Sequence, residues 1–135
     1  ADTTEADGGL YTGFSGLTAD DQELLKNAAV LVYIKSQGVF WPVPGLVSFD
    51  DNKVSNFTFV HFIDKSNFHI EIFQTDWSEQ QEKAPTRIVQ DVKVLVVPAQ
   101  LLARRSKEIN YKSYEETMAA LGLTDKDVRQ FKKTR

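Results

Sequence analysis

The chain contains no cysteine among its 135 residues. Without thiols it can form neither disulfide bonds nor cysteine-based zinc sites, and it has no cysteine nucleophile. Long apolar runs are missing as well, because no stretch approaches the roughly 18 residues that a membrane-spanning helix needs. These absences exclude whole classes of site and leave a folded domain as the expectation.

The net charge is small, at −3, from 16 basic and 19 acidic residues. This balance excludes a generally basic surface of the kind that binds nucleic acids. The charges are unevenly placed: residues 1–27 carry six acidic residues against one lysine, and residues 101–135 carry nine basic residues against five acidic ones. The basic end could favour an anionic surface, but a solvated helix face is the simpler interpretation.

Length and composition predict one domain, since 41% of the residues are hydrophobic and 26% are charged. Residues 1–17 are rich in glycine, threonine, alanine and aspartate, and we expect a flexible tether there. The chain begins with alanine rather than methionine, which is typical of a processed or trimmed product. Residues 18–135 are expected to form a single β-rich domain with C-terminal helices.

Five segments show the periodicity or composition of strands. Residues 28–35 alternate between a buried and a partly covered face. The apolar segment 39–45 contains two prolines, which lack N–H donors, so it predicts an edge strand or an extended connection. Residues 56–63 and 67–74 are β-rich runs that a short turn separates, which indicates a hairpin. Residues 87–97 are apolar on both faces, and this favours a central strand.

The register of this hairpin follows from its apolar pattern. Pairing Phe59 with Ile72, and the other positions in the same register, produces one almost wholly apolar face. That face holds Phe59 with Ile72, His61 with Ile70, and Ile63 with Phe68. The other face holds Thr58 with Phe73, Val60 with Glu71, and Phe62 with His69. A slip of one residue would mix the two sets and lose the buried face, so the pattern predicts the first register.

Three segments carry helix signals. Residues 18–25 begin with a threonine cap and place acidic residues in the first turn. Ser113 and Glu116 form a capping box for a helix that Gly122 ends, and residues 124–131 open a further helix in the same way. The whole pattern predicts a mainly β fold, an antiparallel sheet or β-sandwich of about five to six strands with two short C-terminal helices.

Catalytic and metal-binding patterns do not emerge from the sequence. His61 and His69 point to opposite faces in the predicted hairpin, which favours structural roles over a shared metal ion. Glu71 lies mid-strand without an evident acidic partner, so a solvent-facing position is the simpler interpretation than a hydrolytic role. No nucleophile elbow and no nucleotide-binding glycine pattern is present. We therefore expect no catalytic residue, metal site or cofactor, and no enzyme activity.

Aromatic residues in edge segments and loops are the candidates for ligand binding. Flat rings at such places can stack on a sugar or on a side chain of a partner protein. In a small β-domain most such rings belong to the core instead. The candidate ligand-binding residues are Trp41, Trp77 and Tyr33.

The order of the segments resembles the small C-terminal domains of uncharacterised Bacteroidota lipoproteins. A short helix leads into the strand AAVLVYIK at 28–35, followed by GVFWPVP at 38–44 and the hairpin. A strand then ends in VLVVP at 94–98, and the helix start YKSYEE follows at 111–116. The resemblance spans roughly residues 18–123, and the family has no assigned catalytic residues. This chain departs from the family in having an acidic, glycine- and threonine-rich segment in place of a collagen-like linker.

The resemblance implies a lipidated cysteine upstream of Ala1, a lipid anchor as the sole membrane contact, and a location in the cell envelope. The expected function is a non-enzymatic binding or adhesion module for a glycan or another envelope protein, with no nucleic-acid partner. One alternative is a structural or assembly subunit of an envelope complex. A small hydrolase that uses Glu71 or His69 is a further alternative.

Overall fold

Antiparallel strands make up most of the structure, a computed structural model that describes residues 2–77, 83–98, 111–122 and 132–133. This confirms the prediction of a mainly β fold. The elements, in chain order, are β1 (Asp2–Thr3), β2 (Gly9–Phe14), α1 (Ala19–Lys26), β3 (Ala28–Ser36), β4 (Val39–Val43), β5 (Gly45–Ser48), the 3-10 turn η1 (Asp50–Asn52), β6 (Val54–Asp64), β7 (Asn67–Gln74), β8 (Ile88–Val89), β9 (Asp91–Pro98), α3 (Tyr114–Ala120) and β10 (Lys132–Lys133).

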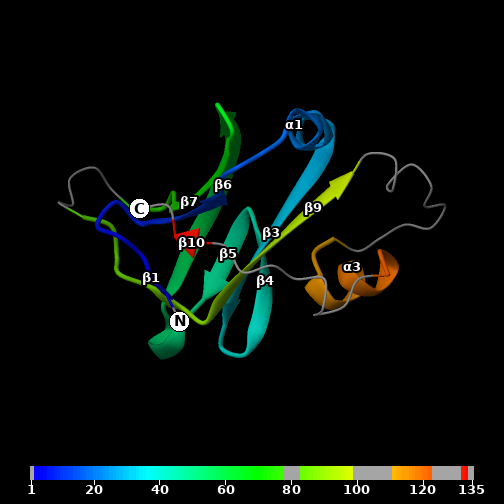
Figure 1. Cartoon of the computed structure of the whole chain (residues 1–135). Coiled ribbons are helices and arrows are strands. Elements are labelled where there is room, and N and C mark those ends of the chain that lie inside the picture. The colour runs from blue at the N-terminus through cyan, green and yellow to red at the C-terminus, as the bar shows by residue number, and fades with distance from the viewer. Residues whose placement is uncertain (1, 78–82, 99–110, 123–131, 134–135) are drawn as a thin grey trace.

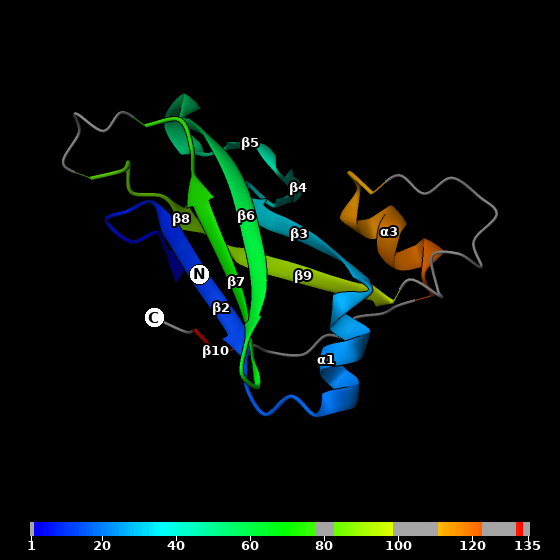
Figure 2. The same cartoon turned by 90° about the horizontal axis from the view of Figure 1, so that it is seen from above.

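The strands form two main sheets that pack face to face (Figure 1). The larger sheet has the order β10-β2-β7-β6-β5, and the smaller has the order β4-β3-β9. The pair β1 and β8 bridges the sheets on one side, because β1 precedes β2 and β8 precedes β9. Figure 2 shows the five-stranded sheet, the three-stranded sheet and α3 as successive layers. The fold is therefore a β-sandwich with a helix on one of its outer faces.

The main core lies between the two sheets. Alternate residues of facing strands point inward and meet there, as the two-residue period of a strand requires. Full burial of a valine, leucine, isoleucine or phenylalanine side chain contributes roughly 1.5–3 kcal/mol to the free energy of folding, so this layer dominates the stability of the fold. The core includes Leu10, Val32, Ile34, Val47, Phe57, Phe68, Ile70, Ile72 and Val89.

A second core lies between the three-stranded sheet and α3, and it contains Tyr33, Leu95, Val97, Tyr114, Met118 and Leu121. Leu95 and Val97 of β9 thus pack toward α3, whereas the even-numbered valines of β9 pack against the main core. The prediction that residues 87–97 form a central strand is wrong. β3 is central, and among the described strands β9 pairs with β3 alone. Both faces of β9 are apolar because its sheet is the middle layer of three.

The hairpin of β6 and β7 has the predicted register. Phe59 pairs with Ile72, and Val60 pairs with Glu71 on the other face. Lys65 in the turn has a φ of 56°, which the two-residue connection between the strands requires. The register is therefore confirmed, and it separates an inward apolar set from a set that faces away from the main core.

Residues 2–17 belong to the sandwich, so the prediction of a flexible tether over residues 1–17 is wrong for the part that the structure describes. β2 pairs with β7 over its whole length, and Leu10 is only 3% exposed in the main core. The glycines of this segment allow close packing. A Cβ atom on Gly13 would lie 2.1 Å from the carbonyl oxygen of Phe68, so no other residue fits there without a shift of the strands.

The proline-containing segment lies at sheet edges, as predicted. β4 is the outer strand of the three-stranded sheet, and β5 is the outer strand of the five-stranded sheet. The chain passes from one sheet to the other between them, at Pro44. Pro42 sits opposite Tyr33 and leaves the pairing of β4 with β3 intact. Edge positions suit this segment because a proline there removes no donor that a further strand would need.

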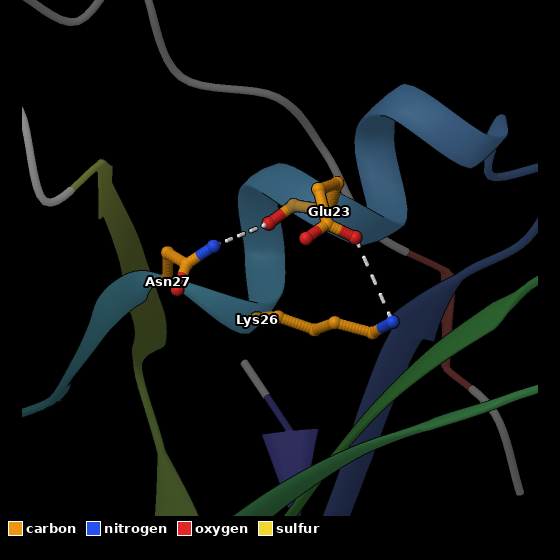
Figure 3. Close-up of polar contacts among 3 residues, drawn as sticks. All are labelled: Glu23, Lys26 and Asn27. Atoms are coloured by element: carbon orange, nitrogen blue, oxygen red, sulfur yellow. Dashed lines mark hydrogen bonds and ion pairs between the residues drawn. The ribbon is translucent and has the colours of Figure 1, made fainter.

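Helix α1 begins at the predicted cap. The Thr18 hydroxyl accepts a hydrogen bond from the Asp21 backbone N–H at 3.1 Å, and the Asp21 carboxylate accepts one from the Thr18 N–H at 3.0 Å. At its other end, the Asn27 side-chain amide donates to the Glu23 carbonyl oxygen at 3.2 Å (Figure 3). Lys26 lies 3.7 Å from the Glu23 carboxylate, and both side chains are exposed, so this ion pair adds little stability.

Helix α3 also begins at the predicted residue. The Ser113 hydroxyl accepts a hydrogen bond from the Glu116 backbone N–H at 3.2 Å. The helix ends next to Gly122, whose φ of 69° suits a glycine after a helix. The second predicted C-terminal helix, over residues 124–131, lies outside the described residues.

Candidate functional site

Tyr33 lies in the second core, beneath α3, and is 1% exposed. Its hydroxyl donates to the carbonyl oxygen of Tyr111 at 2.5 Å and lies 3.0 Å from the Thr117 hydroxyl. Burial raises the pKa of the Tyr33 phenol above its ordinary value. The prediction that Tyr33 lines a ligand-binding surface is wrong, because its ring and its hydroxyl are both used to hold α3 on the sheet.

The two tryptophans are half-buried and lie in different parts of the fold. Trp41, on β4, packs against the main core and donates its indole N–H to the Ser36 carbonyl oxygen at 3.0 Å. Trp77 follows β7 of the five-stranded sheet. The indole of Trp41 is therefore committed to the fold, and a binding role for either tryptophan stays a prediction.

His61 and His69 point to opposite faces of the hairpin, as the register requires. His61 is exposed near Phe59 and Phe68, whereas His69 is half-buried and stacks on Phe62. Within the part of the chain that the structure describes, no three histidine, aspartate or glutamate side chains gather closely enough to hold a metal ion.

The clearest surface feature is the outer face of the five-stranded sheet, the face turned away from the main core. Its strands place large apolar side chains in solvent, where an antiparallel sheet with one solvated face normally carries polar residues. These side chains are Leu46, 62% exposed, Val54, 45%, Val60, 46%, and Phe62, 42%. We call these four residues the apolar outer face. The strand register puts all four on the same face of the sheet. Leu46 pairs with Asn56 and Val54 with Ser48, and these pairs lie on the side that also holds Val60 and Phe62.

Two neighbouring rows cross this face at the hairpin. The first row contains Tyr11, Glu71 and Val60, and the second contains Gly13, His69 and Phe62. The Phe62 and His69 rings stack with centroids 4.9 Å apart and planes 23° from parallel. This contact forms a flat patch beside the exposed side chain of Val60.

On the outer face, the described side chains of strand β2 do not project beyond the backbone of the sheet as far as those of the hairpin do. Gly13 has no side chain, and the Tyr11 ring folds down over Gly9, where a Cβ atom would lie within 2.5 Å of that ring. The Tyr11 hydroxyl donates to the Asp7 carboxylate, which also accepts from the Gly9 N–H at 2.9 Å. The side chains of the hairpin on this face therefore project further from the sheet than those of β2.

Glu71 is the acidic residue at the centre of these rows. It is half-buried, and no lysine, arginine or histidine forms an ion pair with it among the described residues. A carboxylate between apolar neighbours is partly desolvated, so a cation brought to it would interact more strongly than at an open surface. The face thus combines apolar contact area with one carboxylate that forms no ion pair in the part of the chain that the structure describes.

A polar cluster at the other end of β6 has a structural role. The Ser55 hydroxyl accepts from the Arg87 Nε–H at 2.9 Å and donates to the Gln74 side-chain oxygen at 3.0 Å. Gln74 in turn donates to the Pro85 carbonyl oxygen at 2.8 Å. Ser55 and Gln74 are 1% and 2% exposed, and each uses its polar atoms within the cluster. These contacts hold the segment before β8 against the sheet.

Sequence reasoning placed no binding role on Val60 or Phe62. The sequence did contain a signal for such a role. The hairpin face opposite the core was predicted to contain Val60, Phe62 and Phe73, at positions where a solvated sheet normally carries polar residues. The register alone therefore identifies this face as a candidate site.

Comparisons with protein-family models, with curated proteins and with solved structures find no significant match to this chain. The family resemblance, and the anchor and location that it implies, stay predictions. None of the helices that the structure describes has the length and apolar character of a membrane-crossing helix.

Proposed function

We propose that this domain is a protein-binding module that holds its partner on the apolar outer face. The observation that carries the proposal is the group of four large apolar side chains, each more than two fifths exposed, on one face of one sheet. Scattered exposed apolar residues are ordinary on protein surfaces, but two neighbouring pairs on one sheet face, Leu46 with Val54 and Val60 with Phe62, indicate an interaction site. The envelope setting that the family resemblance implies is part of this proposal.

The chemistry of the face favours a protein over a glycan. Leu46, Val54 and Val60 are aliphatic and offer no hydrogen bond to a sugar hydroxyl. Burying them against another apolar surface stabilises a complex by roughly 25 cal/mol per Å² of apolar area removed from water. A partner protein supplies such a surface, with Phe62 as the aromatic anchor.

Pull-down by the immobilised full chain, from an extract of the cells that produce it, tests this function. The double variant Val60→Thr/Phe62→Thr removes the apolar contact at two positions while keeping β-forming residues. Ile88→Thr is the matched control, because Ile88 is 62% exposed on a different sheet. We expect one polypeptide to be retained by the wild type and by the control, and at least tenfold less by the double variant. A photo-crosslinker at position 62 should join the same polypeptide.

Two outcomes would overturn the proposal. The first is equal retention of every polypeptide by all three proteins. The second is binding to a glycan array that is lost in the double variant and kept in Ile88→Thr, which would assign the face to a carbohydrate. Thermal unfolding of each variant checks that the fold is intact before either result is interpreted.

A further inference from the structure

The two rows on the outer face are complementary to each other. Along β7, Glu71 of one row lies two residues from His69 of the other, and along β6, Val60 lies two residues from Phe62. Consider a two-fold axis that lies parallel to the sheet, just outside this face, and runs perpendicular to the strands between the two rows. Rotation about this axis places each row of one copy opposite the other row of the second copy. Two copies of the chain related by that axis would place Glu71 opposite His69 of the second copy, and Val60 opposite Phe62 of the second copy.

We propose that this face binds a second copy of the chain in this arrangement. The inference rests on the proposed function, in that it takes the outer face to be a protein interface. A two-fold interface must be self-complementary. Here a carboxylate meets an imidazole, which can donate a hydrogen bond to it, and an aliphatic side chain meets an aromatic ring, so both the polar and the apolar contacts are matched.

The outer face of β2 allows this packing, because its side chains do not project from the sheet. Gly13 carries no side chain, and Tyr11 is folded over Gly9 at 8% exposure. Neither residue therefore holds the second copy away from the hairpin. Two antiparallel sheets pack face to face about 10 Å apart, a separation that side chains of the size of valine and phenylalanine fill.

The contact is small, because it involves mainly two strands. Two strands of about eight residues, with strands about 4.8 Å apart and a rise of about 3.3 Å per residue, cover on the order of 250 Å² on each copy. Interfaces of this size are weak and reversible. We therefore expect a dissociation constant on the order of 10–100 µM, with monomers at low concentration.

Sedimentation velocity from about 1 µM to about 1 mM protein tests the pairing. The wild type should shift from monomer to dimer over this range. Glu71→Lys sets a lysine against His69 of the second copy, and His69→Glu sets two carboxylates against each other; each should weaken dimerisation by roughly tenfold or more. The double variant His69→Glu/Glu71→Lys sets a lysine opposite a glutamate across the axis and should dimerise at least as well as the wild type.

A wild type that stays monomeric at 1 mM would overturn the pairing and leave the proposed protein-binding function to its own pull-down test. A dimer whose strength is unchanged by both single variants, or a double variant as weak as the singles, would also overturn it. Ile88→Thr serves as the control and should dimerise like the wild type. If the polypeptide that the pull-down retains is this chain itself, and charge-dependent dimers form, the second copy is the partner.

Discussion

Replacing Gly13 by alanine tests whether β2 is part of the sandwich. The added Cβ atom would lie 2.1 Å from the Phe68 carbonyl oxygen and 3.1 Å from its carbonyl carbon, both backbone atoms of the neighbouring strand. Real Cβ contacts are longer than 3.0 Å, so β2 must move away from β7 by about an ångström. The pairing of these strands over Gly9–Phe14 would be disturbed around the new methyl group.

The size of the effect follows from this displacement. Overpacking costs about 1–3 kcal/mol, and each weakened backbone hydrogen bond adds about 1 kcal/mol, which gives about 2–4 kcal/mol in total. For a chain of this length, that loss lowers the melting temperature by roughly 10 °C. Circular dichroism during thermal and urea unfolding measures both quantities.

Gly16→Ala is the matched control, because no atom lies within 4 Å of its added Cβ. Its φ of 76° is unfavourable for alanine, so the control should lose only about 1 kcal/mol. If Gly13→Ala melts at the temperature of the wild type or above it, residues 9–14 do not pair with β7 and the argument for β2 fails. A flexible tether would give that result.

Three further changes test other parts of the structure. Phe57→Ala should lower the free energy of unfolding by about 3–5 kcal/mol in urea titrations, because Phe57 is 0% exposed, whereas Val60→Ala on the outer face should lower it by less than about 1 kcal/mol; equal losses would contradict the assignment of the two faces. Thr18→Ala removes the cap of α1 and should lower the same quantity by about 1 kcal/mol, with Thr18→Ser close to the wild type. Tyr33→Phe tests the buried phenol: burial raises its folded-state pKa above the ordinary 10.0, so its stabilisation is present below pH 10 and is lost as the pH rises through the folded-state pKa. The wild type should therefore lose more stability than Tyr33→Phe between about pH 9 and 11, and parallel losses would show that Tyr33 is not the titrating group.

Local features of the fold were predictable from the sequence. The β6–β7 register followed because a two-residue connection holds the strands together and only one register keeps Phe59, Ile70 and Ile72 on one face. The caps at Thr18 and Ser113 followed in the same way, since a cap involves residues only three positions apart.

Features that depend on distant parts of the chain were not predictable. The glycines near β2 suggested a tether, because composition does not show that Gly13 lies against Phe68, more than fifty residues away. β9 was expected at the centre of a sheet, because a strand that is apolar on both faces looks the same at the centre as in a middle layer. The position of α3 decides between the two, and it also explains why Tyr33 is buried rather than available to a ligand.

The two sheets differ in whether their apolar outer faces are covered. On the three-stranded sheet, Tyr33, Leu95 and Val97 face outward, and the chain covers them with α3. On the five-stranded sheet, Val60 and Phe62 also face outward, and both remain more than two fifths exposed. The same gain on burial drives the docking of α3 and would drive the docking of another surface on the five-stranded sheet. Glu71 lies beside these residues, and the proposed second copy would set its His69 imidazole opposite this carboxylate.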